Sequence, residues 1–182
     1  MNKWVYRTVP VISIFFMLLS NSFAAGNRGF KELKESECTV LAEQDLQKLS
    51  PQWHKYKGFV KICGMKRNKA AKPKVFIVSV WGVDYMEAEK KEMWEEFPCT
   101  IIVDGQFRLL GTFPPDLYPI DPPVDLIVYY GKWKTDIPTE IRIDVLNNAL
   151  GGDYYYAPFI WNAKDGQYQM KTKESKSGKR PK

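Results

Sequence analysis

The chain has 182 residues, a net charge of +6 and an aromatic content of 14%. Two of its 27 basic residues lie in the first 24 positions and six in the last twelve, so residues 25–170 carry 19 basic and 20 acidic residues. This balance argues against a nucleic-acid-binding domain, because such a domain needs an excess of basic side chains on its own surface. The length suits one domain with a sizeable hydrophobic core.

The first 24 residues have the three-part layout of a secretory signal peptide. Lys3 and Arg7 form a basic start, an uncharged and mostly apolar stretch follows, and Ser22 and Ala24 supply the small residues of a cleavage site. The apolar stretch is shorter than the roughly 20 residues of a membrane-spanning helix. We therefore expect residues 1–24 to be removed by cleavage after Ala24. The mature protein is then expected to be bacterial and periplasmic, with secretion into the medium as the alternative.

Residues 25–170 are predicted to form a single globular domain. The basic tail at 171–182 has almost no apolar residues, and we expect it to be disordered. At the start of the domain, residues 29–37 are charged and are predicted to be a poorly ordered lead-in. Apolar side chains at helical spacing predict helices over residues 39–49 and 84–94.

The remaining elements have the period of two that is typical of β-strands. A long, positively charged link from residue 66 to residue 73 separates the first two strands, and residues 131–138 are predicted to be a turn. The predicted strands are residues 58–65, 74–81, the two apolar runs within 99–111 on either side of Asp104 and Gly105, 124–130, 140–146, 154–161 and 167–170. This pattern predicts an α+β fold, predominantly an antiparallel sheet of about seven strands with two helices.

The chain has three cysteines and no Cys-x-x-Cys motif, which argues against a thioredoxin-like redox enzyme. In an oxidising compartment one structural disulfide and one remaining thiol are the simplest outcome. We predict a bond between Cys63 and Cys99, because both lie at the edges of strand-like runs that could be neighbours. Cys38 would then be left over and could link two chains into a disulfide-bonded dimer.

Few residues are available for catalysis. The single histidine, His54, lies outside any nucleophile motif, and the cysteines lack the spacing of a zinc site, so we predict neither a metal nor a cofactor. Paired carboxylates are the remaining option, and Asp84 and Asp121 are the weak candidates. Each has a simpler explanation, since Asp84 suits the N-cap of a helix and Asp121 suits a proline-rich turn. A small envelope hydrolase therefore stays as the alternative function.

Aromatic residues cluster in the second half of the chain. Exposed Tyr and Trp residues are typical of protein interfaces and also stack on sugars, although rings of this kind are equally common in a core. The candidate binding residues are Tyr118, Trp133, Tyr154, Tyr156 and Trp161. We interpret the mature domain as a non-catalytic binding protein of the envelope, such as an accessory, inhibitor or immunity-type protein. Its expected partner is an envelope protein or a cell-wall polymer, and its basic tail could touch an anionic membrane.

Overall fold

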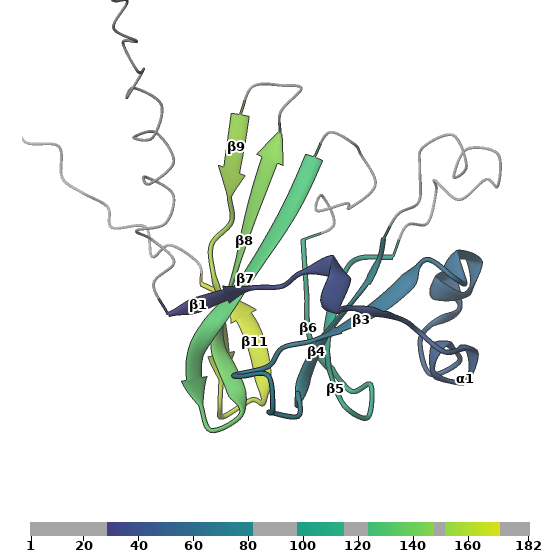
Figure 1. The fold of residues 1–182 in the computed structure, drawn as a ribbon, viewed down its shortest axis with the longest axis horizontal. Helices are drawn as coiled ribbons and strands as arrows, with labels where there is room; N and C mark the ends of the chain where they lie inside the picture. Colours follow the sequence, from purple (N-terminus) through teal and green to yellow (C-terminus); the bar gives the residue numbers. More distant parts are fainter. Residues whose placement is uncertain (1–28, 82–97, 115–123, 148–151, 172–182) are drawn as a thin grey trace, which may run out of the picture.

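The computed structural model describes residues 29–81, 98–114, 124–147 and 152–171. These ranges form two antiparallel sheets (Figure 1). The first sheet has the order β1-β7-β8-β10-β11, with β9 pairing β8, and contains β1 (Phe30–Glu32), β7 (Val124–Lys134), β8 (Ile137–Asn147), β9 (Gly152–Tyr155), β10 (Phe159–Asn162) and β11 (Gln167–Met170). The second runs in chain order through β2 (Thr39–Val40), β3 (Val60–Gly64), β4 (Val75–Val80), β5 (Ile101–Asp104) and β6 (Leu109–Thr112).

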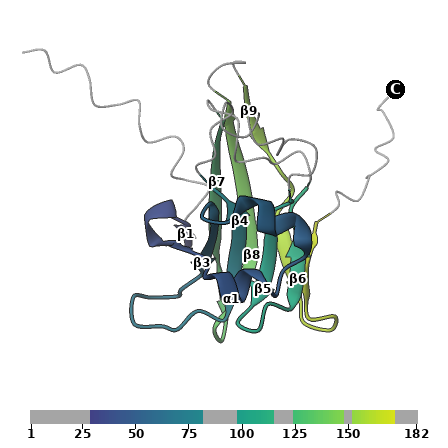
Figure 2. The ribbon, with the colours of Figure 1, turned by 90° about the vertical axis from the view of Figure 1, so that its right-hand side faces the viewer.

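The helical segments of the described residues are short. They are the 3₁₀ helix η1 (Glu35–Glu37), α1 (Glu43–Leu46) and the 3₁₀ helix η2 (Pro51–Tyr56). Figure 2 shows the helical turns around α1 lying across one face of the second sheet. Their apolar side chains, such as Trp53 and Tyr56, bury Val78 and Val80 of β4 on that face. The arrangement is therefore rich in antiparallel β-structure with few helices, which confirms the predicted predominance of antiparallel sheet.

The main core lies between the two sheets. Along β4, Val75 and Ile77 point into this core, whereas Val78 and Val80 point toward the helical turns. Both faces of β4 are buried, as expected for a strand that is apolar throughout. The facing sheet contributes six buried side chains to this core, which are Val128, Tyr130, Ile141, Ile143, Phe159 and Tyr168.

The two sheets meet along β6 and β11, where Gly111 permits a close approach. A Cβ atom at this position would lie 3.2 Å from Cδ1 of Ile102 and 3.2 Å from Cβ of Tyr168. On the other side of the molecule the chain passes from β1 in the first sheet to β2 in the second through η1. The sandwich is thus joined along both sides.

Several predicted elements differ from the observed ones. The described residues contain eleven strands in two sheets, so the expectation of about seven strands in one sheet was too low. The lead-in at 29–37 contains β1 and η1, because β1 pairs with β7. The predicted helix over 39–49 starts as strand β2, since Thr39 and Val40 pair with β3, and only Glu43–Leu46 is α-helical. Here tertiary pairing overrides a local helical spacing.

The sequence predicted the positions of these turns correctly but not their lengths. The turn predicted at 131–138 contains only Thr135 and Asp136, and β7 and β8 fill the rest of it. A hairpin does form around Asp104, although its connection is four residues long, from 105 to 108. The helix predicted at 84–94, the signal peptide at 1–24 and the tail from residue 172 lie outside the described residues and stay predictions.

The disulfide joins Cys38 to Cys63, so the predicted bond between Cys63 and Cys99 was wrong. Thr39 of β2 lies opposite Ile62 of β3, and the same antiparallel register places Cys38 opposite Cys63. Cys99 precedes β5, which is separated from β3 by β4, and two strand spacings amount to roughly 10 Å. Cys99 is the free thiol. Cys38, which was predicted to be left over, is therefore bonded within the chain and offers no thiol for linking two copies.

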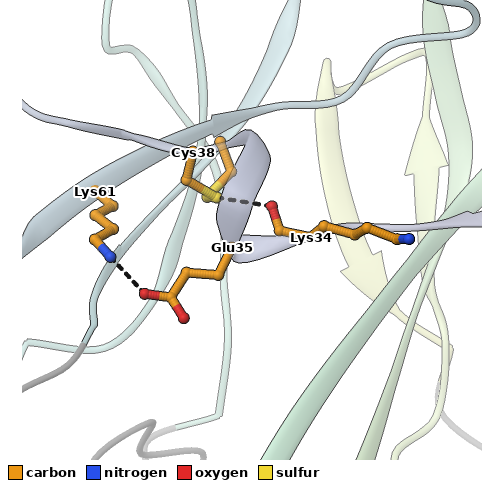
Figure 3. Close-up of polar contacts among 5 residues, drawn as sticks. Lys34, Glu35, Cys38 and Lys61 are labelled. Atoms are coloured by element: carbon orange, nitrogen blue, oxygen red, sulfur yellow. Dashed lines mark hydrogen bonds and ion pairs between the residues drawn. A yellow bond between two sulfur atoms is a disulfide. The ribbon is translucent and has the colours of Figure 1, made fainter.

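An ion pair lies beside this disulfide. Figure 3 shows Lys61 of β3 reaching the carboxylate of Glu35 in η1. Sγ of Cys38 lies 3.4 Å from the carbonyl oxygen of Lys34, and this is a van der Waals contact because a disulfide sulfur carries no proton. The segment that carries the chain from one sheet to the other is therefore fixed to β3 by a covalent bond and by an ion pair.

A buried carboxylate accepts two charged hydrogen bonds on the outer face of the first sheet, near β1. The Glu140 side chain is only 8% exposed and accepts hydrogen bonds from Lys132 Nζ at 2.5 Å and Arg142 Nε at 2.7 Å. The Arg142 guanidinium lies 3.9 Å from the centroid of the Phe30 ring, which belongs to β1. Burial acts to raise the pKa of Glu140, but the two cationic donors outweigh it and hold that pKa below its ordinary value of 4.5.

This lowered pKa predicts a loss of stability in acid. Because the carboxylate titrates at a lower pH in the folded chain than in the unfolded chain, its contribution is complete above pH 4.5 and is lost as the pH falls through the folded-state pKa. Urea unfolding as a function of pH should show this decline. In the Glu140→Gln variant the decline should be shallower, and stability at neutral pH should drop by about 1.5–3 kcal/mol. Identical pH profiles for the two proteins would contradict the assignment.

Candidate functional site

The antiparallel strands place four connections of the described chain at one end of the sandwich. They are residues 65–74, 105–108, 135–136 and 163–166, and they lie together at the lower end of Figures 1 and 2. We call this end the hairpin end. Of the connections between the opposite ends of the strands, residues 41–59 contain α1 and η2, whereas residues 82–97, 115–123 and 148–151 lie outside the described residues.

A hollow of about 750 Å³ opens at the hairpin end, and all four connections or the strand residues next to them contribute to it. We call it the hairpin-end hollow. Its apolar part includes Leu109, Ile137 and the ring of Trp161. Leu109 is 53% exposed and is one of only two large apolar side chains with such exposure in the described part of the chain. The other lining residues are Pro73, Lys74, Val75, Asp104, Gly105, Gln106, Arg108, Leu110, Asp165, Gly166 and Gln167.

Local hydrogen bonds fix the β5–β6 wall of this hollow. Oδ1 of Asp104 accepts from the backbone N–H groups of Gln106 at 2.8 Å and Arg108 at 3.0 Å, and Oδ2 accepts from Arg108 Nε at 2.5 Å. Burial acts to raise the pKa of Asp104, but these donors keep it below its ordinary value. Phe107 has a positive φ of 63°, which this set of bonds stabilises. The connection is thus held in one shape.

The opposite wall is fixed by packing onto the core. The Trp161 ring packs against Tyr168 with a centroid separation of 5.0 Å, and the buried Tyr168 hydroxyl donates to the carbonyl of Pro138 at 2.6 Å. In the neighbouring turn, Asn162 Nδ2 donates to Asp165 Oδ2 at 2.6 Å. Burial raises the pKa of Tyr168, so its hydroxyl stays protonated as a donor. The hollow is therefore preorganised, as binding sites usually are.

The hairpin end is strongly basic, although the domain as a whole is not. Residues 65–74, 104–109, 132–137 and 163–167 carry nine basic and three acidic side chains, and one of the nine, Lys132, is paired with Glu140 outside these ranges. Two of the three carboxylates are paired with cations of the same region, Asp104 with Arg108 and Asp136 with Lys74. The net charge of the domain hides this asymmetry, because three other connections, residues 82–97, 115–123 and 148–151, carry eight acidic and two basic residues in their sequences.

A second, smaller hollow of about 260 Å³ lies beside the edge strand β2. It is lined in part by Val40, Ile62, Phe76 and Phe107, and Val40 is the other strongly exposed apolar side chain, at 55%. The Phe107 ring is covered by Lys48 Nζ at 5.1 Å from its centroid. This hollow has about a third of the volume of the hairpin-end hollow, and we use it as the comparison surface.

The structure separates the predicted aromatic candidates. Trp161 lines the hairpin-end hollow. Trp133 is partly buried with its edge against Tyr130, at a centroid separation of 5.9 Å, and Tyr156 is partly buried against the main core. Tyr118 lies outside the described residues, and only the backbone of Tyr154 is described, opposite Val145 in β8. These rings do not form one exposed cluster among the described residues, and their roles in binding stay predictions.

The catalytic candidates are not tested by the described residues, because Asp84 and Asp121 lie outside them. His54 is exposed, and its Nε2 lies 3.1 Å from the carbonyl oxygen of Leu46. In the described ranges, no three His, Cys, Asp or Glu side chains are grouped so that they could hold a metal ion. None of the helices in these ranges has the length and apolar character needed to span a bilayer.

Sequence reasoning missed most of the hairpin-end hollow. The run from Lys66 to Lys74, with five basic residues and no acidic one, was a visible signal. No sequence pattern marked Leu109 and Ile137 as lining residues, because they are ordinary strand residues that tertiary folding brings to the same end of the sandwich. Comparison of the chain with family models, with curated proteins and with solved structures gave no match.

Proposed function

We propose that this protein is an exported, non-catalytic binding protein of the bacterial cell envelope that holds a partner protein at its hairpin end. The observation that carries the proposal is the hairpin-end hollow, in which the exposed Leu109 and the ring of Trp161 lie in a rigid, concave and partly apolar surface. Aromatic and apolar anchors in such pockets supply most of the energy of protein interfaces. An accessory, inhibitor or immunity-type protein would work through a contact of this kind.

Export is supported by two independent features. The first 24 residues have the layout of a secretory signal peptide, and the structure contains the disulfide between Cys38 and Cys63. Such bonds persist in oxidising compartments and are rare in the cytosol. The periplasm is the proposed location, with release into the medium as the alternative.

Site-specific photo-crosslinking in the producing cell tests this proposal. A benzophenone amino acid replaces either Leu109 in the hairpin-end hollow or Val40 beside β2, which are equally exposed at 53% and 55%. Neither change should reduce stability by more than about 0.5 kcal/mol, because both side chains are on the surface. We expect a discrete protein adduct from position 109 and none from position 40. The same adduct from both positions, or an adduct from position 40 alone, would contradict the proposal.

A further inference from the structure

We infer that the hairpin end recognises an acidic protein segment, in which carboxylates lie on either side of a large apolar side chain. This inference rests on the proposed function and adds the chemistry of the partner. The apolar side chain would enter the hairpin-end hollow beside Leu109 and Trp161, while the carboxylates would meet the basic side chains around it.

The charges available to a partner come mainly from the β3–β4 connection. Lys66, Arg67, Lys69 and Lys72 are all exposed, and no carboxylate of the described residues pairs with them. Lys74, at the end of the same connection, lines the hairpin-end hollow. The unpaired cations thus lie two to eight residues before Lys74 on a connection whose end reaches the rim of the hollow. Positive charge of this density attracts and orients an acidic partner.

The same connection is held in place rather than loose. The carbonyl oxygen of Lys66 accepts a hydrogen bond from Lys31 Nζ at 3.2 Å, and Oδ1 of Asn68 accepts from the backbone N–H groups of Ala70 at 3.1 Å and Ala71 at 2.9 Å. An ion pair of 2.8 Å between Lys74 and Asp136 ties its end to the β7–β8 turn. Because the backbone of this connection is already fixed, binding orders the exposed side chains but little of the backbone, which favours a defined partner.

The shape of the hairpin end favours a protein segment over a lipid bilayer. A surface that inserts into a bilayer presents apolar or aromatic side chains toward the acyl chains. Here the turns carry Gly105 and Gln106, Thr135 and Asp136, and Ala163 and Lys164. The one aromatic side chain in these turns, Phe107, is partly buried against the core beneath the helical turns, and the exposed apolar Leu109 lines the hollow. A concave surface receives a protruding side chain, and a flat bilayer surface supplies none.

The test measures binding of short synthetic peptides by fluorescence anisotropy. The acidic probe has glutamates on both sides of tryptophan and leucine, and the neutral probe has glutamines in their place. We expect the purified full-length mature protein to bind the acidic probe at least about tenfold more tightly than the neutral probe, with an affinity that falls as salt is added. Phosphatidylglycerol vesicles serve as the competing surface.

Two matched variants locate the charge. The hairpin-end variant replaces Arg67, Lys69 and Lys72 with glutamine. The control variant makes the same change at Lys34, Lys55 and Lys57, which are exposed within or next to the helical segments η1 and η2, and of which Lys57 is paired with Glu43. Both lose the same net charge. We expect about tenfold weaker binding of the acidic probe by the hairpin-end variant and less than about a twofold change for the control.

Each other outcome overturns the inference. Equal affinity for the two probes, no binding of the acidic probe, or equal effects of the two variants would show that the partner is not recognised by its acidity. Binding to the anionic vesicles that is lost in the hairpin-end variant, without binding of the acidic probe, would assign this surface to the membrane. An adduct from position 109 together with equal probe affinities would leave the proposed function in place while the acidic partner is rejected. Without the adduct and without probe binding, both fail.

Discussion

Replacing Cys38 with alanine is expected to lower the free energy of unfolding by about 3.5 kcal/mol, the loop-entropy value for a loop of this size. The bond spans 25 positions of sequence and fixes the segment that joins the two sheets. The partner left behind, Cys63, is fully buried, and a buried thiol is a well-tolerated apolar group. The substitution therefore reports mainly on the covalent bond. Urea unfolding without reductant measures the effect.

Cys99 provides the matched control, because it is the free thiol and is only partly buried. We expect Cys99→Ala to change stability by about 1 kcal/mol or less. Mass spectrometry of the non-reduced protein after thiol alkylation should show a single label, and the label should be on Cys99. A label on Cys38, or a larger loss of stability from Cys99→Ala than from Cys38→Ala, would contradict the observed pairing.

Replacing Phe113 with alanine is expected to cost about 3–5 kcal/mol, because it removes a fully buried ring from the contact between the two sheets. Phe113 follows β6 of the second sheet, is 1% exposed and stacks on Phe159 of β10 in the first sheet, with ring centroids 5.3 Å apart. Thermal and urea unfolding measure the loss. Val40→Ala, an exposed change in β2, should stay within about 0.5 kcal/mol of the parent.

A double-mutant cycle gives the sharper test of the sandwich. If the two rings stack across the sheets, Phe113→Ala and Phe159→Ala should be non-additive, with a coupling of about 0.5–1.5 kcal/mol. Strictly additive effects would show that the rings do not touch, and the packing of the two sheets would have to be revised.

The sequence predicted the long strands better than the short ones. The apolar run that forms β4 and the alternation of Ile141 and Ile143 in β8 were visible, because burial of one or both faces leaves a direct pattern. The strands β1 and β2 are two or three residues long and exist because a neighbouring strand offers them a partner. No local pattern of that length can specify a strand, and the division into two sheets is equally a tertiary property.

The candidate site was less predictable than the fold. The sequence predicted aromatic binding residues, and among those whose side chains the structure describes, Trp161 alone lines the hairpin-end hollow. The basic run from Lys66 was recognised as a charged link but not as part of a surface, because the whole-domain charge is close to zero. The run becomes part of a basic surface only through the antiparallel topology, which places it at the same end of the sandwich as Arg108, Lys134 and Lys164.

The central claim is that the hairpin end is the binding surface, and a two-dimensional amide spectrum tests it most directly. The isotope-labelled mature protein is titrated with the acidic probe, and the indole N–H signal of Trp161 is identified from a Trp161→Phe variant. We predict that this signal and the amides of residues 105–109 and 163–167 shift together, while those of β2 and η2 stay in place. Shifts confined to β2 and the smaller hollow, with an unmoved Trp161 signal, would contradict the account.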